Sequence, residues 1–207
     1  MKLHLPAILS CILLSALVSG YAADKSEASK DSESAKKAKK EAKKGYKDRQ
    51  FAAEPTKVKF GEFKRVELKG TSLAPEFQKK KANQESTKKI DEMLQSELKG
   101  VWPDLQVIPA GGEFTKSAER TLQITPSIED IKLVGVGSRV MWGAMAGGSD
   151  IVMKVTYRDS STGEVIANPD FWRGNNAWAG GSSWGKADNE IRDAVVAQIA
   201  NYTRANK

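Results

Sequence analysis

The side chains that most often carry out enzyme chemistry are nearly absent from this chain. The one histidine, His4, and the one cysteine, Cys11, both fall within the first 23 residues. Those residues match a cleaved export signal, with a lysine at position 2, an apolar run over 3–18 and small residues before the cut. A chain cut after Ala22 or Ala23 keeps neither imidazole nor thiol. This excludes Ser-His-Asp and Cys-His catalysis, thiol redox chemistry and zinc or copper sites made of His and Cys.

Two other fates of the first residues are disfavoured. The apolar run has about 16 residues, fewer than the roughly 20 that cross a bilayer, so an uncleaved anchor is the weaker interpretation. Lipid attachment at Cys11 needs small residues just before it; Ser10 fits this requirement and Leu9 does not. The sequence therefore predicts a periplasmic or secreted protein whose signal peptide is cleaved near Ala22 or Ala23. It predicts no outer-membrane lipid anchor and no transmembrane span after cleavage.

Carboxylates are the remaining candidates for catalysis and metal binding. A glycosidase needs two acids at a set separation, one of them with a raised pKa. The acids of the second half, among them Asp159 and Asp170, fall in expected turns or at the ends of expected elements, where they act as caps and solvated charges. Neither a calcium-binding loop nor a phosphate-binding glycine motif occurs. We therefore predict no catalytic residues, no metal site and no cofactor, with a carboxylate-dependent glycan hydrolase as the alternative.

The strongest binding candidate is the stretch 168–185, NPDFWRGNNAWAGGSSWG, which combines tryptophans with amides and glycines. In an exported domain such a loop could stack on sugar rings or hold a partner peptide, because tryptophan offers a large apolar face beside a polar N–H. The alternative is that these side chains cover the end of the core. The candidate binding residues, including one tryptophan from the glycine-rich segment 135–149, are Trp172, Arg173, Asn175, Trp178, Trp184 and Trp142.

The positive charge is concentrated in one part of the chain. The formal net charge is +7, and residues 24–49 hold ten Lys or Arg against six Asp or Glu. Residues 50–207 hold twenty-two against twenty and are nearly neutral, which disfavours nucleic acid as a partner of the domain. The cluster Lys36–Lys44 could instead contact an anionic surface, or be a solvated linker. Polyanion binding through this basic tail remains a further alternative function.

Hydrophobic periodicity divides the rest into a tail and one domain. Residues 24–50 lack an apolar stripe and are expected to be disordered, whereas 51–207 are expected to form a single domain. The predicted class is α+β, a two-layer domain with a mainly antiparallel sheet of four to five strands and two helices on one face. Pro126 is expected at an edge or bulge and Asp188 as an N-cap. Expected strands cover 57–69, 105–108, 121–134, 150–158 and 164–167, and expected helices cover 83–98 and the stretch from 188 onward.

Residues 58–203 resemble a family of small exported bacterial envelope proteins, often lipoproteins, known as domain-of-unknown-function family 4410. The resemblance rests on FGEFKRVEL, MLQSELKG, ERTLQITPSIEDI, GVGSRVMWGAMAGGSD, VTYRDSSTGEVI and IANYTR. It implies an α/β sandwich-like domain similar to periplasmic accessory domains of secretion and envelope machinery. It implies no catalytic residues, and the missing lipidation motif departs from the lipidated members.

Together these observations predict an exported, non-catalytic binding or assembly accessory protein of the bacterial envelope. Its expected partner is an envelope protein or a cell-wall glycan.

Overall fold

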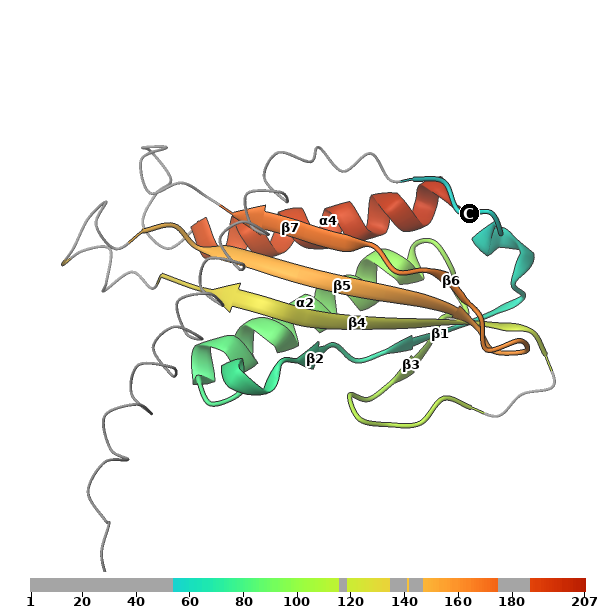
Figure 1. Ribbon diagram of the computed structural model, residues 1–207, viewed down its shortest axis with the longest axis horizontal. Helices are drawn as coiled ribbons and strands as arrows, with labels where there is room; N and C mark the ends of the chain where they lie inside the picture. Colours follow the sequence, from blue (N-terminus) through green and yellow to red (C-terminus); the bar gives the residue numbers. More distant parts are fainter. Residues whose placement is uncertain (1–53, 116–118, 135–140, 142–146, 175–186) are drawn as a thin grey trace, which may run out of the picture. The chain divides into compact units, whose positions relative to one another are not determined.

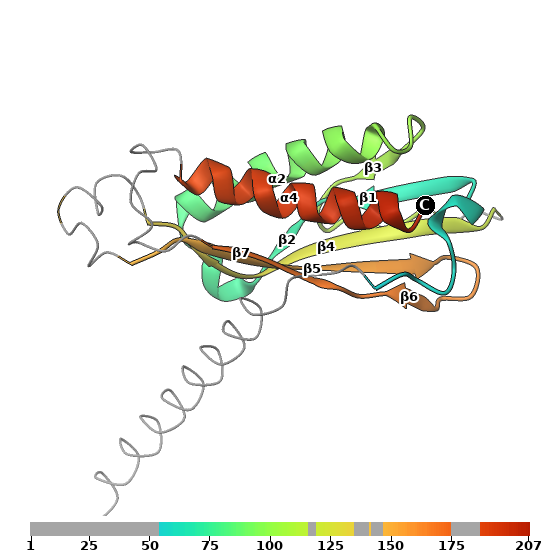
Figure 2. The ribbon, with the colours of Figure 1, turned by 90° about the horizontal axis from the view of Figure 1, so that it is seen from above.

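The computed structural model describes residues 54–115, 119–134, 141, 147–174 and 187–207, which belong to one compact unit. A single sheet carries both long helices, α2 (Lys81–Lys99) and α4 (Ala187–Ala205), on one of its faces (Figures 1 and 2). The α+β class and the two-helix layer predicted from the sequence are thereby confirmed. The strands are β1 (Arg65–Lys69), β2 (Ser72–Leu73), β3 (Gln106–Ile108), β4 (Thr121–Lys132), β5 (Asp150–Asp159), β6 (Val165–Ala167) and β7 (Asp170–Gly174).

The sheet is mixed, and most of its residue pairing is antiparallel, as the sequence predicted; the parallel pairs on one side are the addition. Its strand order is β3-β1-β4-β5-β6, with β2 also pairing with β4 and β7 also pairing with β5. The pairs β1–β3, β1–β4 and β2–β4 are parallel, while β5 is antiparallel to β4, β6 and β7. The reason is that α2 returns the chain across the sheet before β3, and such a crossover permits parallel pairing. The count of seven exceeds the predicted four to five because the added strands are short.

Both helices bury the stripe that their sequences indicate. Ile90, Leu94 and Leu98 of α2 and Val195 and Ile199 of α4 are almost completely inaccessible to solvent. The helices run side by side in the same direction, since Arg192 near the start of α4 donates to Ser86 of α2 and Arg204 near its end pairs with Glu97. Apolar burial of this kind, rather than helix propensity, supplies most of the stability of such helices.

The core includes a cluster of aromatic rings between β5, α4 and the chain that precedes β1. Phe60 stacks on Tyr157 with ring centres 4.6 Å apart, and Tyr202 and Phe171 pack beside them. The expected strand over 57–69 is wrong at its beginning, because Phe60–Glu62 form a 3₁₀ turn. The backbone N–H of Phe60 donates to the carbonyl of Asn206 at 2.8 Å. This segment is therefore hydrogen-bonded to the residues after α4 and not to a strand of the sheet.

Pro126 lies inside a central strand, which corrects its expected edge or bulge position. On one side it faces Val155 of β5. On the other side β1 pairs only as far as Ile124, and β2 pairs only from Ser127 onward. Pro126 therefore occupies the gap between two parallel partners, where its missing N–H breaks no pairing that the register contains.

Two further expectations change near the C-terminal half. Residues 170–174, expected within a loop, form β7 and pair with β5 from Lys154 to Asp150. Pro169, just before this strand, is typical of a loop, which is why the sequence did not indicate a strand here. Its carbonyl nevertheless accepts a hydrogen bond from the N–H of Val155 in β5 at 3.1 Å. Asp188 is not an N-cap, because α4 begins at residue 187. Its carboxylate instead accepts from the hydroxyl of Ser149 at 2.7 Å.

Gly70, between β1 and β2, lies where two backbone segments approach each other closely. A Cβ at this position would come within 2.6 Å of the backbone nitrogen of Ala110. The N–H of Gly70 also donates to Ile108 at 2.7 Å. We expect Gly70→Ala to lower the free energy of unfolding by about 1–3 kcal/mol, measured by urea denaturation. Gly163→Ala is the contrasting variant, because only its positive φ of 71° is strained and nothing lies within 4 Å. A Gly70→Ala protein as stable as the parent would contradict the close approach.

Candidate functional site

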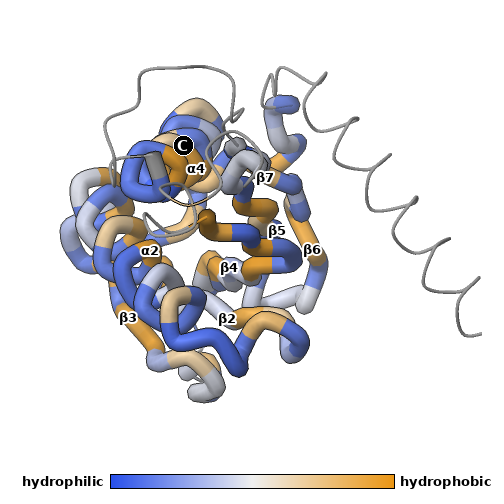
Figure 3. The backbone as a smooth tube through the Cα atoms, turned by 90° about the vertical axis from the view of Figure 1, so that its left-hand side faces the viewer, coloured by the Kyte–Doolittle hydropathy of each residue, from blue (hydrophilic) through white to orange (hydrophobic). Residues whose placement is uncertain are grey.

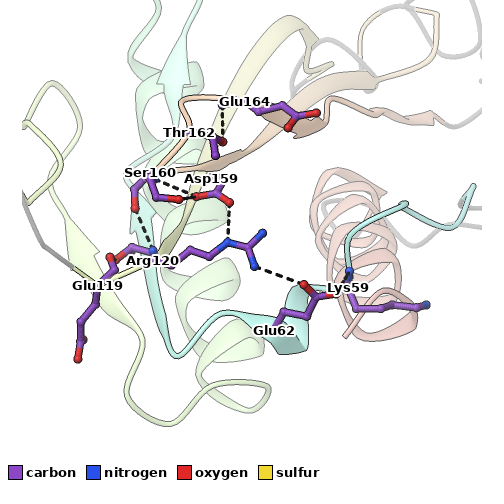
Figure 4. A network of polar contacts seen from close by, with 10 residues as sticks. Lys59, Glu62, Glu119, Arg120, Asp159, Ser160, Thr162 and Glu164 are labelled. Carbon is purple, nitrogen blue, oxygen red and sulfur yellow. Dashed lines mark hydrogen bonds and ion pairs between the residues drawn. The ribbon is translucent and has the colours of Figure 1, made fainter.

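Carboxylates meet at the end of the sheet where β4 begins and β5 ends, and Arg120 joins them (Figure 4). Arg120 Nε donates to Asp159 Oδ2 at 2.7 Å, and Nη1 donates to Glu62 Oε2 at 3.3 Å. The guanidinium also lies 4.4 Å from the centre of the Phe63 ring, a favourable cation–π contact. We call Glu62, Arg120 and Asp159 the Arg120 network.

Asp159 is held from its own turn as well as by Arg120. Its Oδ1 accepts from the backbone N–H of Ser161 at 2.9 Å and from the Ser161 hydroxyl at 2.7 Å. The turn continues through Gly163, whose N–H donates to the Asp159 carbonyl at 2.8 Å. The turn expected at Asp159 is thereby confirmed, and the structure places it in the connection between β5 and β6.

The electrostatics of the Arg120 network favour the ionised form of Asp159. Burial alone would raise the pKa of Asp159, but hydrogen bonds from Ser161 and Arg120 outweigh it and lower the pKa below the ordinary 3.8. The pKa of the Arg120 guanidinium is raised, chiefly by its hydrogen bond to Asp159. A general acid for glycoside cleavage needs the opposite shift, which keeps a proton on the carboxyl at neutral pH. The Arg120 network is therefore suited to holding three chain segments together.

One carboxyl has a raised pKa, but its setting does not suit catalysis either. Burial raises the pKa of Asp91 on α2 above 3.8, although hydrogen bonds from Thr71 oppose the shift. Asp91 Oδ1 accepts from the Thr71 N–H at 2.7 Å, which ties α2 to the turn before β2. Among the described residues, no group of three or more His, Cys, Asp or Glu could hold a metal ion.

Two of the six predicted binding residues lie in the described part of the chain, both on β7. Trp172 is half-buried and packs on Gly174, since a Cβ there would approach its ring to 2.8 Å. Its indole Nε1 is buried without a hydrogen-bond acceptor. Arg173 is exposed, and its guanidinium donates at 3.0 Å to Gln198 of α4 when that amide is oriented to satisfy both its groups. Because neighbouring residues of a strand point to opposite faces, the two side chains leave β7 on opposite faces, and their role in binding stays a prediction.

The other four predicted binding residues lie outside the described residues. They are Trp142, Asn175, Trp178 and Trp184. Their role in binding stays a prediction.

Sequence reasoning missed a fully buried acid on β1. Glu67 has no solvent exposure, its Oε1 accepts from Arg65 Nη2 at 3.1 Å, and its Oε2 has no partner. The only hint in the sequence is that Glu67 alternates with the core residues Val66 and Leu68. That alternation is typical of a solvent-facing residue and would not mark Glu67 as buried.

Comparison with known proteins gives a likeness of fold alone. No protein-family model matches the chain, and no curated protein matches it. A PelC dodecamer structure from Paraburkholderia phytofirmans is 13% identical, covers 70% of this chain and 90% of that chain, and has a TM-score of 0.40. A structure from Xanthomonas campestris, of domain-of-unknown-function family 330, is 9% identical over 74% and 84% of the two chains, with a TM-score of 0.40. A lipoprotein from Neisseria meningitidis is 14% identical over 66% and 96%, with a TM-score of 0.35. Likenesses at this level assign no function.

Across the described part of the chain, no helix is both long enough and apolar enough to cross a membrane.

Proposed function

We propose that the chain is an exported, non-catalytic binding or assembly accessory protein of the bacterial cell envelope. In this proposal residues 1–23 are the cleaved signal peptide, 24–50 the basic tail and 51–207 the folded domain. The resemblance to domain-of-unknown-function family 4410 belongs to the same proposal. Its partner is an envelope protein or a cell-wall glycan.

The Arg120 network is the observation that carries the proposal. It comes close to the paired acids of a hydrolase, because Glu62 and Asp159 both contact one side chain (Figure 4). Yet both carboxylates are engaged by a cation, and the pKa of Asp159 is lowered. A cation between the acids occupies the place that a water or a glycosidic oxygen would need. This arrangement favours a structural role and leaves the hydrolase as the alternative.

The decisive experiment separates binding from hydrolysis. Chain 24–207 would be incubated with isolated peptidoglycan, and both pelleted protein and released soluble fragments would be measured. The proposal expects no fragment release, and Glu62→Gln should leave this result unchanged. Fragment release that Glu62→Gln or Asp159→Asn abolishes would establish the hydrolase instead. Fractionation should also place the protein outside the cytoplasm, with Ala23 or Asp24 at its N-terminus; retention of Met1 in the cytoplasm would contradict export.

Trp172 provides a test of the proposed binding surface. The Trp172 side chain is only half-buried, so part of its indole surface stays open to a ligand. We expect Trp172→Ala to weaken peptidoglycan or partner binding by about 1–3 kcal/mol, measured by co-sedimentation titration. Trp102→Ala is the matched control, because Trp102 belongs to the core. This substitution should lower the melting temperature and leave the affinity of the folded protein for its ligand nearly unchanged. Unchanged binding in Trp172→Ala would remove this residue from the proposed surface.

A further inference from the structure

The most strongly charged segment of the folded domain lies at the beginning of α2. Residues 79–89, KKKANQESTKK, contain five lysines and one acid. All five lysines are exposed. Figure 3 looks onto the end of the domain where α2 begins, and the tube around α2 is largely coloured as hydrophilic. We call these five lysines, Lys79, Lys80, Lys81, Lys88 and Lys89, the lysine surface.

The lysine surface is held in a fixed position by its polar neighbours. Asn83 Nδ2 donates to the Phe77 carbonyl at 3.1 Å, and Gln84 Nε2 donates to the Gln78 carbonyl at 2.6 Å. Asn83 is buried, as is Ile90 about two turns later, so this side of α2 faces inward. Because a helix that buries one face presents the other, Lys81, Lys88 and Lys89 point to solvent. Lys79 and Lys80, just before the helix, are exposed as well.

Nearby acids neutralise only part of this charge. Lys81 lies 3.8 Å from Glu85, and Lys88 lies 3.9 Å from Glu92, in exposed pairs one helical turn apart. Exposed pairs of this kind contribute little energy and leave both charges hydrated. Among the described residues, no carboxylate lies within 4 Å of the remaining lysines of the surface.

The same lysines work against the helix that carries them. Lys80 occupies the N-cap position, no side chain caps the helix, and its first turn contains no acid. Cations at the positive end of a helix dipole are unfavourable, and folding alone favours Asp or Glu there. A departure from local stability rules without a structural gain is a mark of a functional surface.

We propose that the lysine surface rests on an anionic phospholipid membrane. Clusters of four to eight Lys or Arg on an amphipathic helix are typical of segments that bind anionic lipid headgroups. The surface consists of lysines, which act as point charges, and contains none of the arginine forks that recognise nucleic acid. The inference rests on the proposed function, since it names the envelope surface that the exported chain would contact.

Vesicle binding tests this surface directly. Chain 24–207 would be titrated with phosphatidylcholine vesicles that contain or lack phosphatidylglycerol. The triple variant Lys79→Gln, Lys80→Gln and Lys89→Gln should lose about 100-fold in affinity for the anionic vesicles. The control triple Lys57→Gln, Lys64→Gln and Lys99→Gln removes the same charge from exposed lysines elsewhere and should lose less than about threefold. Chain 50–207 shows in parallel how much affinity the basic tail contributes.

Each outcome decides the matter. Equal losses in both triples would overturn the inference, because net charge alone would then explain binding. If the lysine-surface triple bound anionic vesicles as tightly as the parent, the inference would also be overturned. It would likewise fail if this triple lost affinity for DNA or heparin but not for the vesicles. The lysine-surface triple should melt at the same or a slightly higher temperature than the parent, which separates lost binding from misfolding. Cytoplasmic retention of Met1 would refute the proposed function but leave the vesicle result standing, so the two failures are distinguishable.

Discussion

Replacing Phe60 with alanine is expected to lower the free energy of unfolding by about 3–5 kcal/mol. The side chain is fully buried, and its ring lies parallel to that of Tyr157 with an interplanar angle of 16°. Its removal would leave a cavity lined by Tyr157 and Tyr202, whose rings cannot move together without disturbing β5 and α4. Urea denaturation of the parent and the variant measures the change.

The control is Phe77→Ala, which removes the same group from a half-buried position at the edge of the core. A loss of less than half that of Phe60→Ala is expected, because less apolar area leaves water at Phe77. Equal losses would show that the chain before β1 is not an integral part of the core. The larger loss at Phe60 would mean that the segment entering the domain is as firmly packed as a strand.

Local periodicity was sufficient where one face of an element is buried along its whole length. In β5, Ile151, Met153, Val155 and Tyr157 share one face, which the structure buries completely, while Lys154, Thr156 and Arg158 lie on the other face. The stripes of α2 and α4 repeat at helical spacing and were predicted to within a few residues. Such patterns depend only on neighbours in the sequence, so a single chain contains all the information that they require.

Features set by distant contacts could not be predicted in the same way. β7 is a strand because β5 supplies its partners, and Pro126 fits a central strand because β1 ends and β2 begins beside it. The parallel pairing of β1 with β4 depends on the path of α2. None of these conditions leaves a signal in the residues concerned, where proline and glycine instead indicate a loop.

The Arg120 network shows the same limit for the site. Arg120 is separated from Glu62 by 58 positions and from Asp159 by 39. The turn at Asp159 was predictable from Asp-Ser-Ser-Thr-Gly, because Asp hydrogen-bonds to backbone groups ahead of it. Its second role, which depends on β4 and the chain before β1, was not. Sequence therefore indicates Asp159 as a turn residue and leaves its electrostatic partner unidentified.

Asp159 should accordingly have a larger effect on stability than an ordinary turn residue. Asp159→Ala removes three hydrogen bonds from a buried carboxylate and is expected to lower the free energy of unfolding by about 2–3 kcal/mol at neutral pH. Because the folded state lowers the pKa of this group, its contribution is fully present above the ordinary 3.8 and is lost as pH falls through the folded pKa. The parent and Asp159→Asn should thus converge in stability in that acid range, measured by urea denaturation at a series of pH values.

Asp91→Asn is the matched control, and the sign of its pH dependence is opposite. Burial raises the pKa of Asp91, so the folded state favours its protonated form. The stability associated with that proton is fully present below 3.8 and is lost as pH rises through the raised pKa. Asn can still accept a hydrogen bond from the Thr71 N–H without a buried charge. As pH rises, the stability of Asp91→Asn should therefore increase relative to the parent, whereas that of Asp159→Asn should decrease relative to the parent. Parallel pH profiles for the two variants would show that the Arg120 network does not hold Asp159 ionised in the folded protein.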